Sequence, residues 1–124
     1  MSNINYHFHQ GRNMFEDWKQ RIKNNPQVSK FLLWDIDTSN LSDEDMQRMK
    51  VFVVHRVVEL GDENDFYAIL RLYGGFEGVR EAIKQIPAVL HPRNESFVRL
   101  VFNIKKEDLI CYERKRLREQ HLNS

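Results

Sequence analysis

The sequence has a single cysteine, three prolines and no long hydrophobic run, and these scarcities remove several classes of protein. Cys111 has no second cysteine to pair with, so an internal disulfide is excluded, and one cysteine alone does not build a zinc site. An intracellular, reducing compartment is therefore expected. No stretch approaches the roughly 20 apolar residues that a membrane span needs. The N-terminus also lacks the charged head and apolar run of a signal peptide, so we expect a cytoplasmic protein.

Charge of neither sign dominates the chain. There are 19 Lys and Arg against 18 Asp and Glu, which leaves a formal net charge of +1. A nucleic-acid role would therefore need a local cluster of basic residues rather than a globally basic surface. At 124 residues the chain is long enough for one domain with one core.

The densest apolar stretch runs over residues 31–61 and has a clear helix start and stop. Ser42 is a candidate N-cap, with Asp45 three residues later and acidic residues in the first turn. Gly61 is expected to end the helix in a left-handed conformation. The apolar run at 31–34 is too short to be assigned to helix or strand. The apolar residues between Ser42 and Gly61 lie three or four positions apart and form one apolar stripe of a helix: Met46, Met49, Val53, Val57 and Leu60.

The same patterns predict helices on both sides of this stretch. The expected ranges are 14–23, 63–73, 76–86, 95–103 and 105–120, with caps at Asn13, Asp62 and Asn94. Helices joined by short capped turns, without convincing strand alternation, predict an all-α class. We expect a single compact domain of about six short helices. Its parts are an N-terminal arm and first helix at 1–30, a core helical domain at 31–104 and a basic C-terminal helix at 105–124.

Three short motifs carry a family resemblance: LWDID at 33–37, RVVELGD at 56–62 and LYGG at 72–75. Together they resemble a family of small bacterial proteins known as a domain of unknown function, over about residues 31–104. His55 and Val98 depart from the family pattern, which has an acidic and an aromatic residue there. The resemblance implies a companion of nucleotidyltransferase-type toxins, in an antitoxin-like role, and it implies no activity.

Polar and aromatic residues of these motifs form the candidate interaction site. In a strand, Asp35 and Asp37 would point the same way, as paired carboxylates do in metal chemistry. In a turn they would bond nearby backbone amides, and we favour the turn. Arg56 either pairs with Glu59 on its own helix or, if partly buried, bonds Asp35 or Asp62 and ties two elements together. The candidate interaction residues are Trp34, Asp35, Asp37, Arg56, Asp62 and Tyr73.

The C-terminal third supports an alternative, in which the helix at 95–103 follows the helix at 76–86 as in a helix-turn-helix DNA reader. The connecting turn is longer than the usual three or four residues. The candidate DNA contacts are Arg93, Asn94, Arg99, Lys105, Lys106, Arg114, Lys115 and Arg116. DNA binding needs these side chains on one face. Partner binding instead needs exposed, contiguous aromatic residues, with Phe8, Phe15, Trp18 and Phe76 as candidates.

No constellation of residues predicts catalysis, a cofactor or a metal site. We therefore expect a non-enzymatic protein-interaction or accessory domain, antitoxin-like in role, that binds a protein partner or a second copy of itself. The alternative is a DNA-binding regulator that uses its basic C-terminal region.

Overall fold

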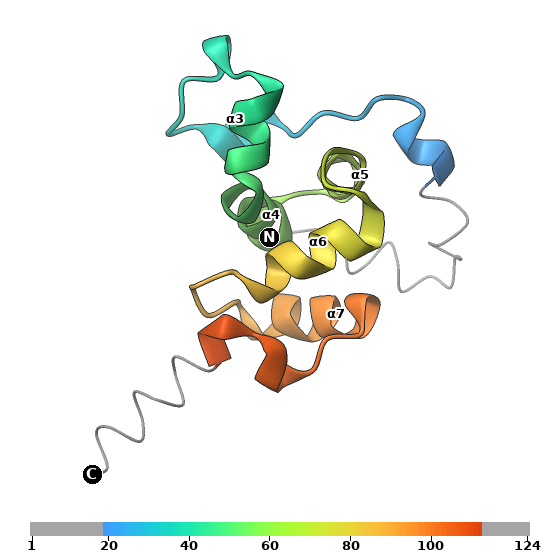
Figure 1. The fold of residues 1–124 in the computed structure, drawn as a ribbon, viewed down its shortest axis with the longest axis vertical. Coiled ribbons are helices and arrows are strands. Elements are labelled where there is room, and N and C mark those ends of the chain that lie inside the picture. Colours follow the sequence, from blue (N-terminus) through green and yellow to red (C-terminus); the bar gives the residue numbers. More distant parts are fainter. Residues whose placement is uncertain (1–18, 113–124) are drawn as a thin grey trace.

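A computed structural model describes residues 19–112 of the chain, and all regular structure within that range is helical (Figure 1). The all-α prediction is therefore confirmed for this part of the chain. The α-helices are α3 (Asp43–Arg48), α4 (Lys50–Leu60), α5 (Glu63–Leu72), α6 (Gly75–Lys84) and α7 (Pro92–Phe102). There are also three 3₁₀ helices in this range: η1 (Lys30–Leu33) and η2 (Thr38–Asn40) precede α3, and η3 (Lys106–Asp108) follows α7. Residues 19–22 and 110–112 are also helical.

Several predictions fall outside the described residues. They concern the cap at Asn13, most of the helix at 14–23, and the continuation of the last helix to residue 120. The candidate contacts Arg114, Lys115 and Arg116 and the aromatic residues Phe8, Phe15 and Trp18 lie outside as well.

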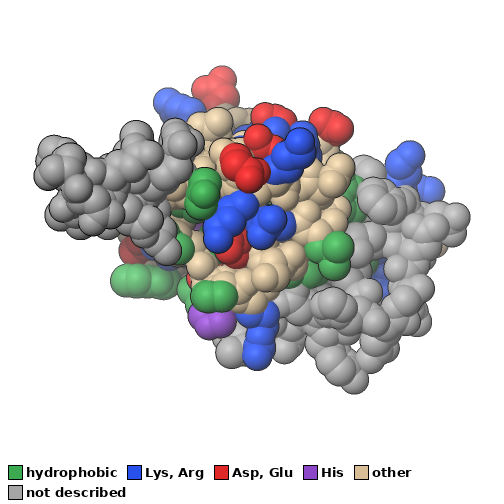
Figure 2. Space-filling view, turned by 90° about the horizontal axis from the view of Figure 1, so that it is seen from below, with side chains coloured by type: hydrophobic (Ala, Val, Ile, Leu, Met, Phe, Trp, Pro, Cys, Tyr) green, Lys and Arg blue, Asp and Glu red, His purple; other side chains and the backbone are tan. Residues whose placement is uncertain are grey.

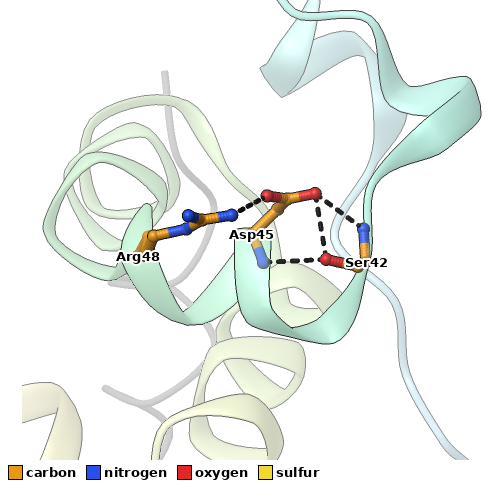
Figure 3. A network of polar contacts seen from close by, with 3 residues as sticks. All are labelled: Ser42, Asp45 and Arg48. Carbon is orange, nitrogen blue, oxygen red and sulfur yellow. Dashed lines mark hydrogen bonds and ion pairs between the residues drawn. The ribbon is translucent and has the colours of Figure 1, made fainter.

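Helix α3 begins at the predicted cap. The backbone amide of Asp45 donates to the Ser42 hydroxyl at 3.1 Å, and the Asp45 carboxylate accepts the Ser42 amide at 3.0 Å. Figure 3 shows the second carboxylate oxygen of Asp45 turned to the guanidinium of Arg48. This reciprocal arrangement is a capping box, which satisfies amides that the first helical turn leaves without partners. The hydrogen bonds from Ser42, and then the one from Arg48, lower the pKa of Asp45.

The single helix predicted between Ser42 and Gly61 is wrong, because the structure interrupts it at Met49. Met49 has φ −89° and ψ 11°, which depart from helical values, and α4 begins at the next residue, with the Met49 carbonyl accepting the amide of Val53 at 2.8 Å. The buried face of α4 is carried by Val53, Val54, Val57 and Val58. Leu60, which the predicted stripe included, lies at the edge of this face and is 50% exposed.

Gly61 ends α4, but the predicted left-handed conformation is wrong. Its φ of −77° and ψ of 171° are extended backbone that any residue can adopt. Glycine is needed for space, because a Cβ atom here would lie 2.7 Å from the carbonyl oxygen of Val57. Among the described glycines, Gly74 and Gly75 are the left-handed ones, with φ of 83° and 75°, and they are the N-cap and the first residue of α6. Helix α6 therefore starts one residue before the predicted Phe76.

The core lies where α4, α5 and α6 pack together, with α7 below them (Figure 1). Phe66 of α5 is fully buried at its centre, and its ring lies 5.9–6.3 Å from the rings of Phe76, Phe97 and Phe102. This aromatic cluster joins α5, α6 and α7. The core also includes Leu109, Cys111 and partly buried Ile22 and Val28, so it extends beyond residues 31–104 at both ends.

Helix α7 starts three residues before the prediction. His91, not Asn94, is the N-cap, since its Nδ1 accepts the amide of Arg93 at 3.2 Å, and Pro92 fills the first helical position. Proline is favoured there because its missing amide would have no partner. After α7 the expected helix from Lys105 is replaced by η3, and α-helical conformation resumes at Ile110.

Candidate functional site

The most exposed aromatic side chains of the described range are those of Phe31, on η1, and Trp34, the residue that follows η1. A 3₁₀ helix has three residues per turn, so residues three apart share a side. Phe31 and Trp34, at the end of η1, are 64% and 76% exposed, whereas Leu32 is buried in the core. Lys30 and Leu33 share another side. The short helix therefore divides its residues between core and surface.

A buried carboxylate holds the start of η1 in place. Asp65 of α5 has no exposed surface and accepts hydrogen bonds from both the amide and the hydroxyl of Ser29, each at 2.7 Å. Its second oxygen accepts the amide of Asp62 at 3.0 Å, which completes the predicted cap of α5. The sequence predicted the cap at Asp62, but nothing in it connected Asp65 with Ser29, 36 residues earlier.

Arg56 of α4 ties η1 and the following turn to the helix core. Its Nη1 donates to the carbonyl of Leu32 at 2.9 Å, and Nη2 donates to the Asp35 carboxylate at 2.8 Å. The guanidinium carbon also lies 4.4 Å from the centre of the Phe52 ring and 5.7 Å from that of Trp34. This confirms the alternative in which a partly buried Arg56 joins two elements through Asp35.

We call Phe31, Trp34, Asp35 and Arg56 the Trp34 surface. The hydrogen bond from Arg56 lowers the pKa of Asp35, and partial burial opposes that shift without cancelling it. Asp35 therefore stays ionised through the neutral and mildly acidic range. The surface presents exposed rings beside an ion pair whose geometry the fold sets.

The other predicted pair of Arg56 does not form, because Glu59 is used elsewhere. Its carboxylate accepts the backbone amide of His91 at 3.1 Å and the side-chain amide of Asn94 at 3.4 Å. Glu59 thereby fixes the N-terminus of α7 to the end of α4. His55, on the same helix, has a pKa that burial lowers and the nearby Glu59 partly restores.

The favoured turn interpretation of Asp35 and Asp37 is confirmed. Asp37 caps η2 by accepting the amide of Ser39 at 3.0 Å and its hydroxyl at 2.6 Å, and these bonds lower the pKa of Asp37. The two aspartates therefore face different partners and do not form a paired-carboxylate site.

Two further candidates take structural positions away from the Trp34 surface. Asp62 caps α5. Tyr73 is buried and donates its hydroxyl to the Met46 carbonyl at 2.9 Å, which ties the end of α5 to α3, and burial raises its pKa to about 12. The motif residues thus separate into a surface group and a group that holds helices together.

The candidate DNA contacts are only partly brought together. Arg93 and Arg99 are six residues apart on α7, which places them about 120° apart around its axis. Arg93, Lys105 and Lys106 are exposed, but Asn94 is buried against Glu59. Figure 2, which views the molecule from the α7 side, shows basic side chains mixed with acidic ones. Among the described residues, these side chains therefore form no unbroken basic face.

The aromatic residue Phe76 also lies elsewhere than expected. It is partly buried and packs 5.5 Å from the ring of Phe102, so it belongs to the core cluster. Among residues 19–112, the exposed aromatic residues are instead Phe31 and Trp34, in the apolar run at 31–34 that the sequence left unassigned between helix and strand.

Residues 19–112 also bear on catalysis and metal binding. Within this range no group of three or more His, Cys, Asp or Glu side chains is placed to hold a metal ion. Cys111 is buried, and this burial raises the pKa of its thiol, which disfavours the reactive thiolate. None of the helices in the described part has the length and apolar character needed to cross a membrane.

Comparison with known proteins bears on the segment that carries this site. Residues 28–83 match the model of a family of unknown function (DUF6922). The match covers slightly less than half of the chain and runs from the segment before η1 to the end of α6. It includes the three motifs but stops short of Ile104, where the resemblance seen in the sequence ended. No curated protein and no solved structure matches the chain significantly.

Proposed function

We propose that the protein is a protein-interaction module that binds its partner through the Trp34 surface. The observation that carries this proposal is the exposure of Phe31 and Trp34, on and directly after one short helix whose Leu32 and Leu33 are buried in the core. Large aromatic side chains are enriched at interaction hot spots, because they bury much apolar area at little cost in conformational entropy. The adjacent ion pair of Asp35 and Arg56 supplies orientation, since a misplaced partner would remove water from these charges without offering polar groups in its place.

The surrounding contacts favour a preformed surface. Asp65 holds Ser29 and Arg56 holds the Leu32 carbonyl, so the backbone before and within η1 is fixed from two sides. A rigid surface loses less entropy on binding than a mobile one. The antitoxin-like role that the resemblance implies would be one form of this function, with a toxin as the partner.

Site-specific photocrosslinking in the cells that produce the protein tests the proposal. The photoreactive residue p-benzoylphenylalanine is placed at position 31 or 34 of the full chain, and at Leu100 of α7 as a control, because Leu100 is 74% exposed but distant in sequence. We expect one discrete adduct from positions 31 and 34 and none from position 100. An adduct of twice the chain mass would identify a second copy as the partner. No adduct, or the same adducts from all three positions, would contradict the proposal.

The alternative function, DNA binding, is favoured by the exposed basic residues Arg93, Lys105 and Lys106 on the α7 side. Binding to random-sequence duplex DNA across a salt series separates the two functions. Neutralisation of several phosphates gives a steep linear fall of log affinity with log salt. We expect no such fall for a protein-interaction module, and a slope of several charges that substitution of Arg93 reduces would favour DNA.

A further inference from the structure

A groove of about 470 Å³ lies beside η1, between the segment at 25–30, the start of α3 and the end of α5. This volume is within the range of ligand-binding pockets. Its apolar lining comes from three parts of the chain: Val28, Leu33, Leu41, Met46 and Leu72. An apolar side chain of moderate size would therefore find apolar contacts in it.

Two basic side chains lie at the same groove. The guanidinium of Arg71 is oriented by its Nε, which donates to the carbonyl of Pro26 at 2.9 Å. Within the described residues, neither Arg71 nor Lys30 forms an ion pair with a carboxylate. A guanidinium held through Nε keeps both terminal nitrogens for one ligand, and this fork matches a carboxylate. Asp43 is the acidic side chain in the lining.

We propose that this groove binds a peptide segment of the partner protein in which a carboxylate lies next to an apolar side chain. The carboxylate would contact Arg71 and Lys30, and the apolar side chain would enter beside Leu72. Asp43 would disfavour the reverse direction, in which the carboxylate points toward α3. The inference rests on the proposed function, because it names the chemistry of the segment that the partner presents.

The geometry of η1 connects the groove with the Trp34 surface. Lys30 and Leu33 line the groove, while Phe31 and Trp34 occupy the next side of the same 3₁₀ helix. One partner would therefore contact both sides of η1, with its aromatic-binding patch on one side and its acidic segment on the other.

Two labelled peptide libraries test the inference with the full chain. In one library a fixed glutamate is flanked by leucines, and in the other glutamine replaces the glutamate. Fluorescence polarisation measures affinity, and NMR of the ¹⁵N-labelled protein locates binding through the amide signals of Lys30, Leu33 and Leu72. We expect the glutamate library to bind at least about tenfold more tightly, which is the effect of a charge-assisted hydrogen bond. Equal binding of the two libraries would overturn the inference.

Matched variants separate charge recognition from loss of folding. Lys30→Gln is expected to weaken binding of the glutamate library several-fold, whereas Lys105→Gln, another exposed lysine, should leave it unchanged. Asp43→Asn should strengthen binding, a direction that a folding defect would not produce. Arg71→Gln would also remove the hydrogen bond to the Pro26 carbonyl, so the test uses the lysine variants, which do not disturb that bond. Equal effects of Lys30→Gln and Lys105→Gln would contradict the inference.

The two proposals fail in distinguishable ways. Crosslinking at position 34 without binding of the glutamate library would refute the groove and leave the Trp34 surface in place. Charge-dependent peptide binding without crosslinking would support the groove as a peptide site and refute the Trp34 surface.

Discussion

Replacement of Asp65 by asparagine tests how the fold positions η1. The carboxylate is fully buried and accepts three hydrogen bonds, two from Ser29 and one from the amide of Asp62. In Asp65→Asn, the remaining side-chain oxygen can still accept the hydrogen bonds from Ser29. The new NH₂ group, however, faces the Asp62 amide, so that two donors meet. The remaining bonds also lose the negative charge that strengthens them.

The magnitude follows from these contacts. One charge-assisted hydrogen bond is lost and the others are weakened, which amounts to about 3 kcal/mol of unfolding free energy. For a domain of this size, we expect the melting temperature to fall by roughly 15 °C. Asp43→Asn is the control, because Asp43 also lies in a first helical turn but is exposed, and it should cost less than about 0.5 kcal/mol.

The assay is urea unfolding followed by circular dichroism. A loss below about 1 kcal/mol in Asp65→Asn would refute the reasoning, because it would mean that water or a rearranged side chain satisfies the buried donors. If the protein stays folded, the variant should also reduce crosslinking from position 34, since the segment that carries Trp34 would no longer be held at Ser29.

Two further predictions concern glycine positions and pH. Gly78→Ala would place a Cβ atom 1.4 Å from the Tyr73 carbonyl oxygen, so we expect a loss of about 3 kcal/mol or more, whereas Gly74→Ala meets no atom within 4 Å and should cost about 1 kcal/mol for its left-handed backbone. Equal melting temperatures of these two variants would contradict the steric explanation. The pKa of Asp35 is lowered in the folded state, so the stabilisation from its contact with Arg56 is present above its ordinary pKa of 3.8 and is lost as the pH falls through the lowered value. The stability difference between wild type and Asp35→Asn should therefore disappear in strong acid, and urea unfolding that shows a constant difference from pH 7 to pH 2 would refute this.

Local features were predictable from the sequence because their partners lie within one helical turn. The caps Ser42 with Asp45 and Asp62 with Asp65 are separated by three residues, and the structure contains both. The cap of α7 was misplaced because asparagine is a preferred capping residue and histidine is not, so Asn94 was the better local candidate. The decision for His91 depended on Glu59, which binds the amide of His91 and the side chain of Asn94 from another helix.

The candidate site also combines features that the sequence predicted with contacts that it did not. The sequence identified Trp34, Asp35 and Arg56 as candidate residues, but it did not show that they lie together on one surface. Arg56 had two acidic neighbours within reach along the chain, and its choice of Asp35, 21 residues away, depended on how η1 packs against α4. Asp37, Asp62 and Tyr73 were equally good candidates in the sequence, but in the structure they cap helices or hold two helices together.

The sequence by itself determined the helical class, the starts of α3 and α5 and the aromatic and charged residues available for binding, because these depend on composition and on contacts within a turn. Only the tertiary structure decided that Phe31 and Trp34 remain exposed, that Asp65 holds Ser29, and that Lys30 and Arg71 meet at one groove. The physical reason is that these outcomes depend on which surfaces the core leaves uncovered, and that is set by contacts between residues far apart in the chain.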